Sequence, residues 1–429
     1  MKNSNVDWIG QIPDDWQTKT VRECLVERVD KNKDLSEKTI LSLSAKEGVT
    51  LYNGENHSGN KPKEDLSGCK IVKINDIVAN SMNILSGSVG LSDYNGVVSP
   101  VYYIYYNRKK ENDIRFFSYI FQCQEFQKNL RRLGKGILIK ETEDGKLNTI
   151  RTKVPSKLLS LENIPYPSPE KQKKIVEFLD KKCSEIDKLI EVENQQIEKL
   201  KEYRTSVVFN ALTKSLIKER ELKDCNLPWI SKMPLGWNVC KIKHIAKLET
   251  GSTPPTTNPG YFDGKINWFT PGDFKDLEVS DSARKITDTA VADGYKPYPL
   301  FSTLLIGIGG TAGKVAYMTA EGYSNQQITA LIPKSIENKY LFYLMNSLSQ
   351  YIKDNAHYTT LPIINNSYLG NVKVIIAPKN EQKEIVEYLD DKCVKIVNLI
   401  SLKNKKIKWI QEYKKSIIYE YITGKKEIV

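Results

Sequence analysis

A glycine-rich stretch at residues 307–315, "GIGGTAGKV", is the segment whose residue types come closest to a phosphate-binding loop. A Walker loop needs a glycine at position 308 and a Ser or Thr after Lys314, but the chain has Ile308 and Val315 there. A dinucleotide-binding fold needs a helix after the loop, whereas residues 315–318 are short and β-prone. The sequence therefore predicts that this loop binds no nucleotide cofactor.

Motifs for other catalytic or metal chemistry are also missing from the sequence. The partial counterpart of an adenine-methylation motif, Thr253-Pro254-Pro255, lacks both the amide and the aromatic residue, and no paired nuclease core stands out. The three histidines lie apart at 57, 244 and 357, and the seven cysteines form no C-x-x-C pair. We therefore expect a chain without catalysis and without a metal or cofactor of its own, whose cysteines are buried or partly buried thiols.

Composition limits the partners and the location of the chain. Its 429 residues suffice for two or three domains, and 64 basic against 52 acidic residues give a net charge of +12. This charge favours a polyanionic partner, although a lysine-rich composition alone accounts for it equally well. Neither a long apolar run nor a signal peptide is present in the sequence, so we expect a cytoplasmic protein.

Two repeated motifs show which elements must position any functional residues. The pattern W-I-x-x-x-P-x-x-W occurs at 8–16 and 229–237, and "QKKIVEFLDKKC" at 172–183 matches "QKEIVEYLDDKC" at 382–393 at nine of twelve positions. The sequences between these motifs do not resemble each other. The chain is thus a duplicated frame that carries two unlike modules.

The repeated frame is predicted to be helical. From residue 170 to about 214, and again up to Gly424, apolar residues recur at coiled-coil spacing without an internal Pro or Gly. Near-balanced charge on these helices indicates a solvated face beside an apolar seam, and not a DNA-binding surface. Their apolar positions are Ile175, Leu179, Ile186, Leu189 and Leu200 in the first copy and Ile385, Leu389, Ile396, Leu399 and Ile410 in the second.

The two modules are predicted to be mixed α/β. Short β-branched or aromatic runs at 71–74, 97–106 and 304–306 predict strands, and residues 116–130 and 340–352 have helical spacing. We expect curved β-sheets with helices. The predicted domains are 1–165, the first module; 166–221, the first spacer helix; 222–376, the second module; and 377–429, the second spacer helix.

With these motifs, the chain resembles the specificity (S) subunits of Type I restriction-modification systems over nearly its whole length. The resemblance rests on the two W-I-x-x-x-P-x-x-W motifs, on the repeated helix motif, and on "GSTPPTTNPGYFDGKINWFTPGDF", "GIGGTAGKVAY" and "YSNQQITAL" in the second module. Lys171 departs from the family, which usually has Glu there, as at Glu381.

The resemblance implies two target-recognition domains, each recognising half of a bipartite sequence in double-stranded DNA. It also implies an antiparallel coiled coil of the two helices that docks two methyltransferase subunits and, through them, restriction-translocase subunits. S-adenosylmethionine, ATP and Mg are then expected on the partner subunits only.

Candidate DNA contacts follow from residue type and loop position. Asn and Gln can pair with an adenine edge, and basic residues or glycine-rich loops can approach phosphates, but solvated loops and helix ends have the same composition. The candidates are Ser81, Asn83, Arg131, Arg132, Lys135, Lys140 and Arg151 in the first module and Thr311, Lys314, Asn325, Gln326, Gln327, Tyr358, Thr359 and Thr360 in the second.

Two alternatives stay open. The chain can be a standalone DNA-binding protein, or a helical scaffold whose basic charge is incidental. In the helices, Glu193 and Lys403 occupy equivalent positions of the two copies and lie in the apolar stripe, which predicts either a direct ion pair or two solvated side chains.

Overall fold

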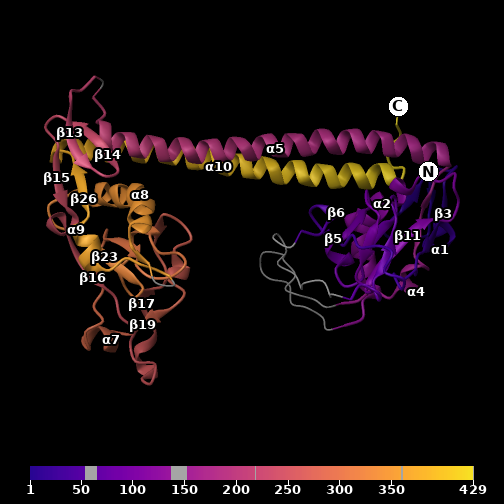
Figure 1. Cartoon of the computed structure of the whole chain (residues 1–429), viewed down its shortest axis with the longest axis horizontal. Helices are drawn as coiled ribbons and strands as arrows, with labels where there is room; N and C mark the ends of the chain where they lie inside the picture. The colour runs from indigo at the N-terminus through magenta and orange to yellow at the C-terminus, as the bar shows by residue number, and fades with distance from the viewer. Residues whose placement is uncertain (54–64, 137–151, 218, 359–360, 429) are drawn as a thin grey trace. The chain divides into compact units, whose positions relative to one another are not determined.

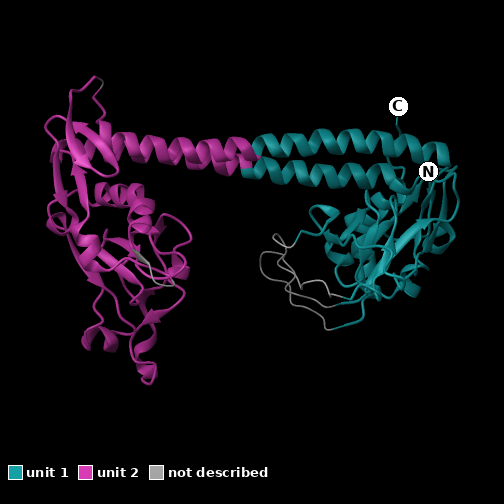
Figure 2. Cartoon of the chain, viewed as in Figure 1, with its two compact units in different colours: residues 1–193, 404–429 teal, residues 194–403 magenta. Residues whose placement is uncertain are grey.

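A computed structural model describes residues 1–53, 65–136, 152–217, 219–358 and 361–428 (Figure 1). The chain divides into two compact units (Figure 2). The first unit contains residues 1–193 and 404–429, and the second contains residues 194–403. The division runs through both long helices, so each module is grouped with half of each helix.

Two long helices form the frame, as predicted: α5 (Pro169–Lys214) and α10 (Lys379–Ile422). Gly424 follows α10 with a φ of +69°, and its N–H donates to the carbonyl of Tyr421, which is the glycine C-cap expected from the sequence. In each unit, half of α5 packs antiparallel against half of α10. The rings of Phe178 and Tyr421, for example, lie 4.4 Å apart in the first unit.

In the first unit, the module is built on a four-stranded antiparallel sheet. Its strand order is β4 (Leu25–Glu27), β11 (Tyr102–Asn107), β8 (Ile77–Asn80) and β9 (Val89–Leu91). Two further antiparallel pairs are β5 (Leu41–Ser44) with β6 (Gly48–Leu51) and β7 (Lys70–Val72) with β10 (Gly96–Val98). The helices are α2 (Ile114–Gln122), α3 (Gln124–Leu130), α1 (Val21–Cys24) and α4 (Ser156–Leu159), with η1 (Ile84–Ser86) and η2 (Arg131–Leu133).

Two predicted elements of this module are each divided in two. The strand expected at 97–106 is β10 and β11, because Pro100 has no N–H to donate and a turn closes from Tyr102 to Ser99. The helix expected at 116–130 is α2 and α3, since Cys123 between them has extended backbone angles.

The module of the second unit contains two sheets. The five-stranded sheet has the order β16 (Ala246–Thr250), β23 (Ile328–Pro333), β20 (Thr303–Ile306), β21 (Val315–Met318) and β18 (Glu278–Val279). The three-stranded sheet has the order β19 (Lys285–Ile286), β17 (Phe262–Phe269) and β22 (Gly322–Ser324). The helices are α8 (Asn338–Asp354), which covers the predicted 340–352, α6 (Ile242–Ile245), α7 (Asp288–Ala292) and α9 (Asn366–Asn371), with η3 (Pro259–Tyr261) and η4 (Pro271–Asp273).

Short strand pairs belong to the duplicated frame. Strands β3 (Gln17–Thr20) and β12 (Asn163–Tyr166) pair antiparallel just before α5, and β15 (Asn238–Lys241) and β26 (Lys373–Ile376) pair in the same way just before α10. The remaining pairs are β1 (Lys2–Asn3) with β2 (Gln11–Ile12), β13 (Leu222–Leu227) with β14 (Ile230–Pro234), and β24 (His357–Tyr358) with β25 (Pro362–Ile363).

Each unit has hydrophobic clusters of its own. In the first unit, Ile175 and Leu179 of α5 and Ile417 of α10 belong to the same buried cluster as Trp8 and Phe117 of the module. In the second unit, an equivalent cluster joins Ile385 and Leu389 of α10 to Trp237 and Tyr340, among others. Because burial of this apolar surface is the main stabilising term, each module is held to the frame by its core.

Candidate nucleic-acid interface

A repeated glutamine fixes each module to its long helix. Gln172 is fully buried; its Oε1 accepts from the N–H of Asp113 at 3.1 Å, and its Nε2 donates to the carbonyl of Pro167 at 3.0 Å. In the second unit, Gln382 accepts from the N–H of Glu337 at 2.9 Å and donates to the carbonyl of Ala377 at 2.8 Å. The frame therefore anchors two unlike modules by the same bonds, at the residue that starts a helix of each module.

The position before this glutamine differs between the units. Glu381 accepts from Arg220 at 2.6 Å and from Trp237 Nε1 at 3.0 Å. Burial opposes the charge on Glu381, but these hydrogen bonds outweigh it and lower the pKa of the carboxyl group. Lys171 instead forms an exposed ion pair with Asp15. The departure from the family pattern thus replaces a partly buried ion pair by a surface one.

The basic cluster of the first module separates into structural and free residues. Arg132 donates to both carboxylate oxygens of Glu162, at 2.7 and 2.5 Å, so its guanidinium is already occupied. Arg131 is exposed, and its side chain has no hydrogen bond or ion pair with any described residue. Lys135 is exposed, and its backbone pairs with Lys153. The candidates Lys140 and Arg151 lie outside the described residues.

Ser81 does not fit the expected DNA contact. Its side chain is fully buried, and its hydroxyl is one of the buried polar atoms that have no partner in the described part of the chain. Its carbonyl accepts from the N–H of Val154, which holds it inside the module. Asn83, two residues later, is exposed at the turn that leads into η1. Of these two candidates, only Asn83 is accessible to a ligand.

The glycine-rich loop connects two antiparallel strands, β20 and β21. The strand β21 begins at Val315, so a strand and not a helix follows the loop, as predicted for residues 315–318. Lys314 Nζ donates to the carbonyl of Phe274, so this ammonium ties the loop to η4. Thr311 at the loop tip is exposed. The loop therefore offers Thr311 and backbone N–H groups to a ligand, while Lys314 has a structural bond.

The amide run after β22 contains one accessible and one buried side chain. Asn325 is buried, and its Nδ2 donates to Gln327 Oε1 at 3.0 Å, so these two amides stabilise each other. Gln326 is exposed and accepts a hydrogen bond from the hydroxyl of Thr253. Sequence reasoning missed Thr253 as a neighbour of this run, since the two are 73 residues apart.

The last candidate segment is described in part. The backbone of Tyr358 lies in β24 and pairs with Pro362, and Thr359 and Thr360 lie outside the described residues.

The apolar positions predicted for partner docking are mostly buried within their own units. Ile175, Leu179, Ile186, Ile385, Leu389 and Ile396 are each at most 7% exposed, because they form the seam and the core. Leu200 and Ile410 are half-buried, and Leu189 and Leu399 are exposed. Other exposed apolar side chains on the two helices are Val192, Trp409 and Tyr413 in the first unit and Tyr203, Val394, Val397 and Leu402 in the second.

Near the middle of the two helices, a lysine of α10 bonds to a side chain of α5 in each unit. The carboxylate of Glu193, only 4% exposed, forms a 2.6 Å ion pair with Lys406 in the first unit. Lys403 donates to Gln196 in the second unit. The sequence predicts either a direct pair of Glu193 with Lys403 or two solvated side chains; Glu193 is buried, and within its own unit its carboxylate pairs with Lys406, one helical turn after Lys403.

No group of three His, Cys, Asp or Glu side chains in the described ranges could hold a metal ion, and no described helix is long and apolar enough to cross a membrane. All seven cysteines are described, are free thiols and are buried or partly buried, as expected. Burial raises the pKa of Cys183 and of Cys393.

Known proteins are similar to this chain in sequence. The putative Type I restriction enzyme MjaX specificity subunit of Methanocaldococcus jannaschii is 23% identical over 449 residues, which cover 97% of this chain and 95% of that protein. The MjaIX specificity subunit of the same organism is 33% identical over 183 residues, which cover 40% of this chain and 41% of that protein. The chain likewise spans 64% of the MjaVIII specificity subunit.

Solved structures show the same fold at low sequence identity. The HsdS subunit from Thermoanaerobacter tengcongensis superimposes with a TM-score of 0.52 at 14% identity, over 96% of this chain and 98% of that one. A chain from a study of complex assembly and conformational transition of the type I R-M system reaches a TM-score of 0.72 at 14% identity, with the same coverage.

The sequence model of one family covers both repeats. It is described as the Type I restriction modification DNA specificity domain, and it matches residues 13–202 and 234–420. Each match contains one W-I-x-x-x-P-x-x-W tryptophan, one module and most of one long helix. The chain therefore belongs to the family of Type I restriction modification DNA specificity domains.

Proposed function

We propose that this chain is the DNA sequence-recognition subunit of a Type I restriction-modification complex. Its two unlike modules each recognise half of a bipartite, asymmetric site in duplex DNA. The observation that carries this proposal is the repeated anchor: Gln172 and Gln382 make matching bonds to modules whose sequences do not resemble each other. A frame that holds different modules in the same way suits a protein that recognises two different half-sites.

Exposed polar side chains of both modules are available for DNA contacts. In the first module these are Asn83 and Arg131, and in the second they are Thr311 and Gln326 with Thr253 beside it. The amide of Gln326 can pair with a base edge, and the guanidinium of Arg131 suits a phosphate. Buried candidates such as Ser81 and Asn325 support the fold of the modules instead.

The long helices dock two methyltransferase subunits, which in turn carry the restriction-translocase subunits. Exposed apolar side chains support this, because such residues on a helix surface mark protein contacts. Several are related by the 210-residue offset of the repeat, namely Leu189 with Leu399, Val192 with Leu402, and Tyr203 with Tyr413. Two equivalent apolar surfaces suit two copies of one partner.

Catalysis then belongs to the partners. The subunit itself is non-catalytic, and S-adenosylmethionine, ATP and Mg bind to the methyltransferase and translocase subunits. The complex acts on DNA in the cytoplasm.

The decisive experiment is to express the chain together with the neighbouring methyltransferase in a host without other adenine methylation and to sequence the methylome. A split, asymmetric methylated motif and co-purification of the two proteins are expected. DNA binding without co-purification would favour a standalone DNA-binding protein, and no salt-dependent DNA binding would favour a helical scaffold.

A further inference from the structure

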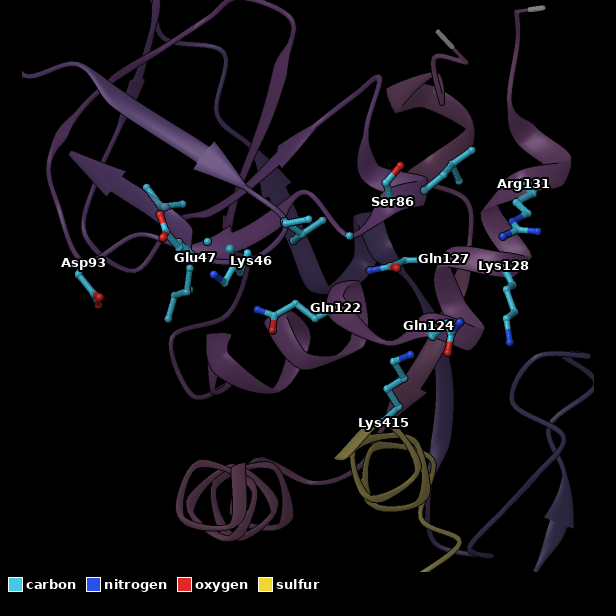
Figure 3. Close-up of a pocket in the computed structure, with 18 residues that line it drawn as sticks. Lys46, Glu47, Ser86, Asp93, Gln122, Gln124, Gln127, Lys128, Arg131 and Lys415 are labelled. Atoms are coloured by element: carbon cyan, nitrogen blue, oxygen red, sulfur yellow. The ribbon is translucent and has the colours of Figure 1, made fainter. Parts of the chain in front are cut away.

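A cleft of about 620 Å³ opens in the first unit beside the long helix α10 (Figure 3). Its walls come from the β5–β6 hairpin, the segment from η1 to β9, helices α2 and α3, and the side chain of Lys415 on α10. Figure 3 shows Lys415 extending from α10 toward Gln124 of α3. The cleft therefore combines residues of the module with a residue of the frame.

Glycines keep the floor of this cleft open. A Cβ at Gly90 would lie 2.9 Å from the N atom of Val49 and 3.0 Å from the Cα of Gly48, so β9 and the β5–β6 hairpin approach each other backbone to backbone. At the rim, Gly87 has a φ of +86°, which L side chains rarely adopt. A larger residue at position 90 would push the hairpin outward and change the shape of the cleft.

The charge of the lining is positive. Four basic side chains line the cleft against two acidic ones: Lys46, Lys128, Arg131 and Lys415 against Glu47 and Asp93. Two of the cations have only exposed ion pairs on their own helices, Lys128 with Glu125 at 3.7 Å and Lys415 with Glu412 at 2.7 Å. Such pairs contribute about 0–1 kcal/mol and exchange easily for a stronger anion.

The side chains of Arg131 and Lys46 have fewer partners than those of Lys128 and Lys415. Neither side chain has a hydrogen bond or ion pair with a described residue, and both side chains are exposed. Among them, Arg131 presents a planar guanidinium that can bind a phosphate with two parallel hydrogen bonds. Its neighbour Arg132 is already paired with Glu162, so a phosphate would have to compete with that carboxylate.

Neutral amides complete the lining. Gln122, Gln124 and Gln127 line the cleft between the basic residues, and Gln127 is held in place because its Nε2 donates to the carbonyl of Phe121 at 2.9 Å. Amides and cations together suit the oxygen-rich sugar–phosphate backbone of DNA, since most protein–DNA hydrogen bonds go to phosphate and sugar.

We propose that this cleft receives the sugar–phosphate backbone of the first half-site, with Arg131 and Lys415 contacting phosphates. The inference rests on the proposed function and deepens it: the frame helix α10, and not only the module, takes part in DNA binding. The position equivalent to Lys415 in the other repeat, 210 residues earlier, is the uncharged Thr205. The frame therefore supplies this phosphate contact to one half-site only.

The test uses the complex of the full chain with its methyltransferase partner and a duplex that carries the methylated motif. Dissociation constants are measured at several salt concentrations for Arg131→Gln, Lys415→Gln and the double variant. Each lost phosphate contact should reduce the slope of log K against log[salt] by about 0.9. The loss of affinity between about 50 and 200 mM salt then shrinks about 3.5-fold per contact. Hydroxyl-radical footprinting should show weaker protection at one half-site.

Matched variants separate the alternatives. Lys157→Gln removes the same charge from an exposed residue of α4 that does not line the cleft, and Lys415→Arg keeps the charge; both should retain the slope of the unmodified complex. Equal slopes for all variants, an equal loss in Lys157→Gln, or a change of base preference without a change of slope would each overturn the inference. If the unmodified complex bound no duplex at all, the proposed function would fail instead.

Discussion

Tyr119 of the first module donates a 2.7 Å hydrogen bond from its hydroxyl to Asp180 of the long helix α5. The second unit repeats the bond at 2.6 Å, from Tyr343 to Asp390, 210 residues after Asp180. Burial and the neighbouring carboxylate raise the pKa of both tyrosines, so each remains a hydrogen-bond donor at neutral pH. The two bonds are a second anchor between module and frame, beside Gln172 and Gln382.

We expect Tyr119→Phe to destabilise the first unit by about 1 kcal/mol, the contribution of a typical hydrogen bond. The loss stays small because Asp180 is 44% exposed and can be rehydrated. Hydrogen exchange followed by mass spectrometry should show faster exchange in residues 1–193 and unchanged exchange in 194–403. Tyr343→Phe should give the reverse pattern, and equal acceleration of both units in either variant would contradict separate anchors.

Acid should weaken the second unit through Glu381. Because the folded-state pKa of Glu381 lies below its ordinary value of 4.5, the charged form is favoured by folding. Its contribution to stability is therefore complete above about pH 4.5 and is lost as the pH falls through the lowered pKa. Melting temperatures of the unmodified chain and of Glu381→Gln should differ at pH 7 and converge below pH 4.5. A difference that does not depend on pH would show that the ion pair with Arg220 is not responsible.

Removing Lys406 and removing Glu193 from their ion pair should change the stability of the first unit by different amounts. Lys406→Ala removes one partner of a carboxylate that is only 4% exposed and should cost about 1–3 kcal/mol, more than the about 0–1 kcal/mol that a surface pair contributes. Glu193→Leu replaces the carboxylate by an apolar side chain in the seam and should be neutral or stabilising. Thermal unfolding measures both changes. The exposed pair of Lys182 and Glu185 on the same helix provides the control, and Lys182→Ala should leave the melting temperature nearly unchanged.

Exchange of one module should change one half-site. Replacing residues 20–160 with the first module of another family member should alter one half of the methylated motif and leave the other half intact, because each unit has its own clusters. The donor must supply large apolar residues at Phe116 and Phe117, since these pack in one cluster with Ile175 of the frame. Methylome sequencing of the chimera is the measurement. A change in both half-sites of a folded, methyltransferase-bound chimera would contradict independent recognition.

Local pattern predicted the frame and the class of the modules well. The helices α5 and α10 follow from apolar spacing, and the cap at Gly424 follows from glycine's tolerance of positive φ, so both are properties of neighbouring residues. The breaks at Pro100 and Cys123 were missed, because a single turn inside a periodic run changes its spacing little.

The candidate site was harder to predict because accessibility depends on distant residues. Arg131 and Arg132 are adjacent and chemically alike, but only Arg132 meets Glu162, 30 residues away. Burial of Ser81 follows from the packing of the whole module, and Lys415 reaches the cleft from the other end of the sequence. Such contacts between distant segments leave no local signal in the sequence.

The division of the chain into units has a consequence for the order of events during synthesis. The second unit is one continuous segment, residues 194–403, whereas the first also needs residues 404–429. Ile417 and Ile422 from that segment belong to the same cluster as Trp8 and Ile9. Because domains of a growing chain fold as units once their residues have emerged, the second unit can complete its core while the first still lacks part of its own. The module that the ribosome makes first is therefore the one that is finished last.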